Sequence, residues 1–209
     1  MSEQAQTEQL IKKTAKKVFF QKGFLDATTQ EIADEAGVNR ALIHYYFRSR
    51  EQLLDTLIEE SVREKKEKMR AILTSSLTFR EKIAQYIDVM IDRGIEYPYM
   101  ENFLITEMAR KPEQMKVLCA IDKIKSSDLI KKELEEEIAN GSVAPVTSQH
   151  FMINLSSMCA YPVIAKPIFQ MVHGMSDSDY KKFLLERKQV IYTSIFNEPL
   201  PKKKLTQIV

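Results

Sequence analysis

The sequence predicts an all-α fold of about nine helices. The 209 residues include five glycines and seven prolines, too few for the many tight turns of an all-β fold. Apolar residues recur at helical spacing through most of the chain, and capping signals stand before several of these stretches. Long helices joined by short loops are therefore the expected architecture.

The composition is that of a globular protein. Hydrophobic residues make up 44% and charged residues 29%, no apolar run approaches the length of a membrane span, and the N-terminal segment is polar. We therefore expect a cytoplasmic protein with no membrane partner. The two cysteines, Cys119 and Cys159, could form one disulfide, but we favour buried thiols in a reducing compartment.

The first helix is expected over residues 7–22, with Gly23 as its C-terminal stop. One face is an apolar stripe, and the other faces carry four lysines, Lys12, Lys13, Lys16 and Lys17. These lysines form either an ordinary solvated surface or one that attracts the backbone phosphates of a nucleic acid, and the sequence leaves both open. Because the net charge is only +2, any basic surface must be local.

Two short helices follow, separated by a glycine turn. Thr28 and Glu31 have the spacing of a capping box, in which each side chain accepts a hydrogen bond from the backbone amide of the other residue. Gly37 ends this second helix, and Asn39 is the expected N-cap of the third. Two short helices joined by a turn of three or four residues with a glycine form a helix-turn-helix unit.

The third helix has two chemically different faces. Ile43, Tyr46 and Phe47 fall on one side at helical spacing and should face a core. The other side presents a cation, a small residue, an imidazole and a phenol, namely Arg40, Ala41, His44 and Tyr45. Such a face suits a helix that lies in a DNA groove. Arg40 could pair with a guanine or hold a phosphate, and both remain open.

Six further helices are expected after the third. The expected ranges are 50–73, a helix after residue 78 that carries Ile83 to Ile95, 98–110, 112–140, 148–170 and 177–196. The polar middle of the first of these indicates a solvated helix that bridges two domains. Pro162 and Pro167 should kink or split the segment 148–170. We place the domain boundary after residue 50, which gives domains at 1–50 and 51–209.

Sequence patterns for catalysis and metal binding are missing. The chain has no glycine-rich phosphate loop, no His-Glu-x-x-His, no Cys-x-x-Cys and no nucleophile elbow. Its histidines, His44, His150 and His173, lie far apart in sequence. We therefore expect no enzymatic activity, no cofactor and no metal, and keep an all-α enzyme as a rival hypothesis.

Methionines and aromatic residues gather in the C-terminal two-thirds of the chain. They serve either as core residues or as the lining of a deformable apolar pocket, since methionine repacks around irregular ligands. Both roles can hold at once. The residues expected to line such a pocket are Tyr86, Met90, Tyr97, Phe103, Met108, Met115, Asn154 and Met158.

Residues 28–53 read T-x-x-E-I-A-x-x-A-G-V-x-x-x-x-I-x-x-Y-F-x-S-R-E-x-L. This run resembles the DNA-binding signature of TetR/AcrR-type regulators, and the resemblance covers about the first 55 residues. It implies an N-terminal helix-turn-helix DNA-binding domain and a C-terminal domain for ligand binding and dimerisation. It also implies a homodimer in which the helices at 148–170 and 177–196 of each subunit form a four-helix bundle.

The resemblance assigns DNA contacts to particular positions of this chain. The matching residues are Thr28, Asn39, Arg40, Ala41, His44, Tyr45 and Tyr46, and Arg50 at the position of a usual phosphate-contacting lysine. The chain departs from the family pattern in two places. Asn39-Arg40-Ala41 stands where Ser-Lys-Gly is common, and His44 stands where tyrosine is usual. These departures leave the fold expectation intact and the operator sequence open.

The expected function is that of a ligand-responsive, DNA-binding transcriptional regulator. It would be a repressor that binds a pseudo-palindromic operator in double-stranded DNA as a homodimer and is released by a small, largely apolar effector. The alternatives are an activator, or a helical protein-interaction module that uses the same helix-turn-helix.

Overall fold

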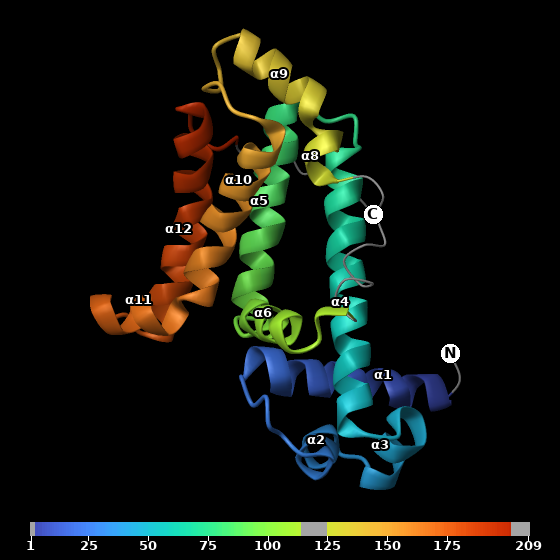
Figure 1. Ribbon diagram of the computed structural model, residues 1–209. Helices are drawn as coiled ribbons and strands as arrows, with labels where there is room; N and C mark the ends of the chain where they lie inside the picture. The colour runs from blue at the N-terminus through green and yellow to red at the C-terminus, as the bar shows by residue number, and fades with distance from the viewer. Residues whose placement is uncertain (1–2, 114–124, 202–209) are drawn as a thin grey trace. The chain divides into compact units, whose positions relative to one another are not determined.

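A computed structural model describes residues 3–113 and 125–201, which form eleven α-helices, one π-helical turn and no strand. The all-α prediction is confirmed. In chain order the elements are α1 (Glu3–Lys16), the π-helical turn η1 (Lys17–Gln21), α2 (Thr29–Ala36), α3 (Arg40–Phe47), α4 (Arg50–Leu73), α5 (Phe79–Glu96), α6 (Met100–Arg110), α8 (Ser126–Leu129), α9 (Lys131–Ala139), α10 (Ser148–Ile164), α11 (Lys166–His173) and α12 (Asp177–Phe196) (Figure 1).

One expected helix is wrong in extent, and another is split as its prolines predicted. The helix expected over 112–140 is not continuous, because Lys125 is extended with ψ 146° and α8 begins after it. The segment 148–170 is split at Ala165 into α10 and α11. Pro162 lies inside α10, whereas Pro167 lies in the first turn of α11, where its missing N–H costs no helical hydrogen bond. These breaks explain why the described residues contain more helices than expected.

The chain divides into two compact units that cut across the order of the sequence. One unit holds Met1–Glu67 and Glu96–Asp122, and the other holds Lys68–Ile95 and Lys123–Val209. The first unit thus includes α6 together with the N-terminal helices. The functional boundary that we expect after residue 50 stays a prediction, since compactness alone does not test it.

The first unit is held together by one apolar core and by ion pairs. Buried residues from α1, η1, α2, α3, α4 and α6 pack into a single cluster, with Ile11, Phe19, Ile32, Ile43, Leu53 and Met100 all fully buried. Lys12 of α1 also pairs with Glu60 of α4 at 2.7 Å. Burial lowers the pKa of Lys12, but hydrogen bonds to Glu60 and Glu8 outweigh burial and raise it.

A π-helical turn ends α1 and connects it to α6. Lys22 N donates to Lys17 O at 2.9 Å, one residue farther back than an α-helical bond. The Phe20 carbonyl then accepts from Tyr99 N at 3.1 Å, and the Phe20 ring packs 5.7 Å from that of Phe103. Gly23 lies against the Tyr99 ring, where a Cβ would come within 2.9 Å. The end of α1 is therefore fixed to the start of α6.

In the second unit, α5, α10 and α12 surround the other apolar core (Figure 1). Pro162 has no N–H to donate to the carbonyl of Met158, four residues earlier. Arg187 of α12 donates to that carbonyl at 3.3 Å, and the Tyr180 hydroxyl donates to the Pro162 carbonyl. Burial raises the pKa of Tyr180 to about 12. The proline inside α10 is thus compensated by side chains of α12.

Two further expectations concern cysteines and membranes. Cys159 is buried in the second unit, and Cys119 lies outside the described residues. None of the helices in the described part of the chain combines the length and apolarity that crossing a membrane requires.

Candidate nucleic-acid interface

The start of α2 is fixed by the expected capping box. Glu31 N donates to Thr28 Oγ1 at 3.2 Å, and Thr28 N donates to Glu31 Oε2 at 2.7 Å. The Thr28 hydroxyl also donates to Glu31 Oε2 at 2.8 Å. These bonds, first the one from the Thr28 backbone and then the one from its side chain, lower the pKa of Glu31. The Thr28 hydroxyl is therefore used within α2, although the residue is exposed.

The turn between α2 and α3 also follows its sequence signals. Gly37 adopts φ 66°, and its N–H bonds to the Ala33 and Asp34 carbonyls at the end of α2. Asn39 is extended, and its Oδ1 accepts from Ala41 N at 2.8 Å. Val38 packs against the core of the first unit. Each boundary of the helix-turn-helix is thus specified by residues within a few positions of it.

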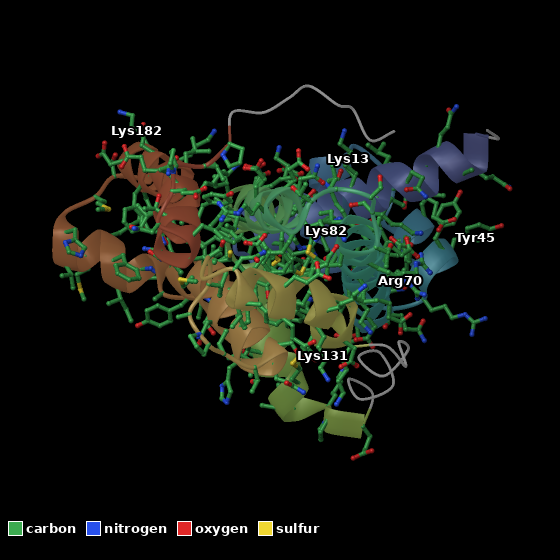
Figure 2. The ribbon with its side chains drawn as sticks, turned by 90° about the horizontal axis from the view of Figure 1, so that it is seen from above. Lys13, Tyr45, Arg70, Lys82, Lys131 and Lys182 are labelled. Atoms are coloured by element: carbon green, nitrogen blue, oxygen red, sulfur yellow. The ribbon has the colours of Figure 1, made fainter. Side chains whose placement is uncertain are left out.

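The two faces of α3 are separated as expected. Ile43 and Phe47 are buried, and Tyr46 is half-buried against the core. Tyr45, labelled in Figure 2, is 69% exposed. Its ring meets the Tyr46 ring edge-on, with the ring centres 5.0 Å apart. The remaining residues of the outward face, Arg40, Ala41 and His44, are also exposed. The structure therefore brings four of the predicted DNA-contacting side chains onto one open surface.

Two side chains of this surface are oriented by neighbours. Arg40 Nε donates to Thr29 Oγ1 of α2 at 3.1 Å, which leaves the two terminal nitrogens of the guanidinium for other partners. His44 Nδ1 lies 2.9 Å from the Arg48 carbonyl. Thr29 and Arg48 were not foreseen from the sequence. No sequence signal marks Arg48, whose φ of 60° is unusual for a residue with a side chain.

Arg50 holds part of the first unit together. Its Nε donates to the Ala27 carbonyl at 2.7 Å, and its Nη2 donates to the Leu25 carbonyl. The guanidinium also lies 5.4 Å from the centre of the Phe19 ring. Arg50 thereby ties the start of α4 to the loop before α2. Its contact with a DNA phosphate stays a prediction. Only the N–H groups of the guanidinium that do not bond to these two carbonyls could make that contact.

The lysines of α1 and η1 have partners that the sequence did not reveal. Besides the Lys12 pair, Lys16 lies 3.2 Å from Glu64 of α4 and also sits over the Tyr97 ring at 4.9 Å. Lys17 lies 3.7 Å from Glu35. Lys13 is exposed and has no carboxylate partner within the described ranges (Figure 2). Three of the four lysines thus lie beside carboxylates of their own unit.

The residues expected to line a ligand pocket are divided between the two compact units, and their role in a pocket stays a prediction. Tyr86 and Met90 are buried in the core of the second unit, and Met158 is half-buried against it. Asn154, on α10 of the same unit, is exposed. In the first unit, Tyr97 and Phe103 pack with the core, and Met108 is 41% exposed. Met115 lies outside the described residues. No group of three or more His, Cys, Asp or Glu side chains in the described ranges could hold a metal ion.

Comparisons with known proteins agree with this geometry. The family model described as bacterial regulatory proteins, tetR family, matches residues 11–57, the segment that carries the helix-turn-helix. The chain is 39% identical over 69 residues to the HTH-type transcriptional regulator BetI of Brucella anthropi. That match covers 33% of this chain and 36% of BetI, so the chain spans about a third of the length of this curated relative.

Two more comparisons extend over most of the chain. The probable HTH-type transcriptional regulator YttP of Bacillus subtilis is 22% identical over 194 residues, which are 91% of this chain and 94% of YttP. A solved structure described as a transcriptional regulator of the TetR/AcrR family from Thermobifida fusca superposes with a TM-score of 0.62. It is 16% identical and covers 90% of this chain and 97% of its own, so it shows the fold alone. All three are named as regulators of transcription and none as an enzyme.

Proposed function

Because this chain belongs to the TetR family of bacterial regulatory proteins, we propose that it is a homodimeric repressor that binds a pseudo-palindromic DNA operator. A small, largely apolar effector would release it from the DNA. The observation that carries the proposal is the outward face of α3, where Arg40, Ala41, His44 and Tyr45 are exposed beside a buried apolar face. In a two-fold dimer, two such helices about 34–36 Å apart would meet successive major grooves.

The proposed dimer is supported by exposed apolar residues on the helices expected to form it. On α10, Ile153 and Tyr161 are each 59% exposed and lie eight residues apart, about 80° from each other around the helix. On α12, Leu185 and Val190 are 45% and 50% exposed. Large apolar side chains that gather on one pair of helices indicate an interaction surface. A second copy of the chain would cover them in a four-helix bundle.

The proposed effector site lies in the second unit. Tyr86, Met90 and Met158 belong to one core there, and two methionines near a phenol suit an apolar ligand with a polar group. A ligand can release DNA only to the extent that it prefers the conformer that does not bind DNA. Helix α4 is the natural lever, because its residues belong to the cores of both units.

DNA binding by the full-length chain tests the proposal. We would measure fluorescence anisotropy with duplexes from the promoter of its own gene and with a scrambled duplex of equal length. Arg40→Ala with Tyr45→Ala should abolish specific binding while circular dichroism and the dimer mass stay unchanged. Lys131→Ala, an exposed cation of the second unit, is the matched control and should bind as the parent does. Equal binding by the double variant and the parent would refute the assignment of α3.

The rival assignment to a protein-interaction module gives a different result. Binding through phosphates weakens steeply as salt rises, because the protein displaces counterions from the DNA. A helix-turn-helix used for a protein partner would show no preference between specific and scrambled duplexes at any salt concentration. Expression from the same promoter with and without the protein then separates a repressor from an activator, since only a repressor lowers it.

A further inference from the structure

The ring of His44 is held by the residue that ends α3. Arg48 N donates to the His44 carbonyl at 3.0 Å, and the Arg48 carbonyl lies 2.9 Å from His44 Nδ1. Arg48 has φ 60° and ψ −43°, so its peptide departs from the helical path. Both backbone groups of Arg48 are thus bonded to the same histidine. The imidazole is fixed at one of its two nitrogens.

This contact selects the tautomer of the neutral ring. A carbonyl oxygen accepts hydrogen bonds and cannot donate them, so Nδ1 must carry the proton. The other nitrogen, Nε2, then has a lone pair and no proton, and it acts only as an acceptor. His44 is exposed, and Nε2 has no hydrogen-bond partner among the described residues. In the neutral ring, the exposed Nε2 of His44 can therefore only accept a hydrogen bond.

We infer that His44 determines specificity by accepting a hydrogen bond from an exocyclic amino group in the major groove, the N6 amino group of adenine or the N4 amino group of cytosine. This inference rests on the proposed function, since it requires α3 to lie in the groove. The major-groove edges of guanine and thymine offer only acceptors at the corresponding atoms. Two acceptors repel, so the neutral ring selects against guanine and thymine at the position that it faces.

Of the polar residues on this face, His44 is the one whose role as hydrogen-bond donor or acceptor is fixed by a contact within the protein. Arg40 offers only donors, because a guanidinium has no acceptor. The Tyr45 hydroxyl can donate or accept, so it does not distinguish the two kinds of base edge. A neutral histidine could also do either, and only the bond to Arg48 makes it an acceptor. The backbone turn at Arg48 thus contributes to base selection without touching DNA.

The first experiment is a selection of binding sites from randomised duplexes with the full-length protein in mildly alkaline buffer. The parent protein should enrich adenine or cytosine at one position of each half-site. His44→Ala should lose the preference at that position and keep it elsewhere. His44→Gln, whose amide both donates and accepts, should retain affinity with relaxed preference.

The second experiment removes the amino group from the DNA. If adenine is selected, purine replaces it in a synthetic operator, and if cytosine is selected, 2-pyrimidinone replaces it. Loss of the hydrogen bond should weaken binding by the parent on the order of tenfold. The same replacement should cost His44→Ala almost nothing, because the partner of the amino group is already gone. If the base replacement weakened binding by His44→Ala as much as binding by the parent, the inference would be overturned.

Failure of the inference can be told from failure of the proposed function. If no protein selects any sequence, the DNA-binding proposal itself is wrong. If a sequence is selected and residue 44 faces guanine or thymine, or no position responds to His44→Ala, only the inference is wrong. Nitrogen chemical shifts of the His44 ring give a readout without DNA and should show the proton on Nδ1. A proton on Nε2 would contradict the fixed polarity.

Discussion

Replacing Gly94 with alanine would test how closely α5 and α10 approach each other in the second unit. An alanine Cβ at this position would lie 2.4 Å from Val163 Cγ2 and 3.3 Å from Val163 Cγ1. Carbon atoms in good contact lie about 3.5–4.0 Å apart. Val163 is 2% exposed and Gly94 is buried, so neither the valine side chain nor a new methyl group at position 94 can move into solvent. The glycine is needed for close packing, not for an unusual backbone angle.

Two effects of Gly94→Ala oppose each other. Alanine in place of glycine inside a helix stabilises it by roughly 1 kcal/mol. Overpacking in a core costs about 1–3 kcal/mol. Because the Cβ would approach Cγ2 far more closely than carbon atoms in good contact do, the cost should be near the upper end of this range. We therefore expect Gly94→Ala to lower the free energy of unfolding by about 1–2 kcal/mol.

A second substitution tests whether the contact with Val163 causes the loss. Val163→Ala removes both methyl groups that the new Cβ would meet, and alone it should cost about 2–3 kcal/mol through lost burial and a cavity. In the double variant the Cβ at position 94 has room and gains the helix preference of alanine. The double variant should therefore be more stable than the sum of the single changes by about 2 kcal/mol.

Thermal unfolding of the four proteins, followed by far-ultraviolet circular dichroism, measures these differences. For a chain of this length, each 1 kcal/mol corresponds to roughly 2–4 °C in the midpoint. Gly94→Ala should lower the midpoint, and the double variant should recover much of the combined loss. A midpoint raised by Gly94→Ala, or strictly additive effects, would refute the close contact between α5 and α10.

Three further predictions follow from individual side chains. Arg50→Lys should destabilise the first unit by about 2 kcal/mol, because an ammonium cannot bond both loop carbonyls and stack on a ring, and faster amide exchange in the loop before α2 would show it. The capping boxes of α2 (Thr28 with Glu31) and α12 (Ser176 with Asp179) lower the pKa values of Glu31 and Asp179 below their ordinary values of 4.5 and 3.8. Their stabilisation is present above those values and lost as pH falls through the lower folded pKa values, so Glu31→Gln should flatten the acid limb of a stability curve against pH. Arg48→Gly should raise stability by about 1 kcal/mol by relieving a positive φ, whereas Asn197→Gly should change little because asparagine tolerates φ 53°; equal thermal shifts in both would contradict this.

The helix-turn-helix could be predicted because its boundaries depend on local chemistry. The capping bonds of Thr28, Glu31, Gly37 and Asn39 each join residues no more than four positions apart. The separation of the two faces of α3 follows from helical periodicity, which is also a local property. For this reason the exposed residues of α3 that we propose to face DNA could be chosen from the sequence. The same reasoning found the fold class.

Other features depend on partners that are distant in sequence. The half-buried position of Arg50 requires the carbonyls of Leu25 and Ala27, which lie more than twenty residues earlier. The π-helical turn depends on Tyr99, far along the chain, whose N–H donates a hydrogen bond to the Phe20 carbonyl. Neither contact leaves a periodic or capping signal. The expected pocket residues are divided between the two units for the same reason, because helical spacing identifies an apolar face but not the core that it joins.

The ion pairs of the first unit limit what kind of DNA binding the proposed function can use. Lys12 and Lys16 lie beside Glu60 and Glu64, so the lysines of α1 connect two helices of the unit. With a net charge of +2, the chain has little excess of cations to spread over a DNA backbone. If each subunit contacts two or three phosphates, a dimer neutralises about four to six, and log K should fall with log salt at a slope of about −4 to −5. Affinity would then depend mainly on the outward face of α3, which a two-fold dimer presents twice. Base selection by Arg40 and His44 would account for a large share of the discrimination between sites.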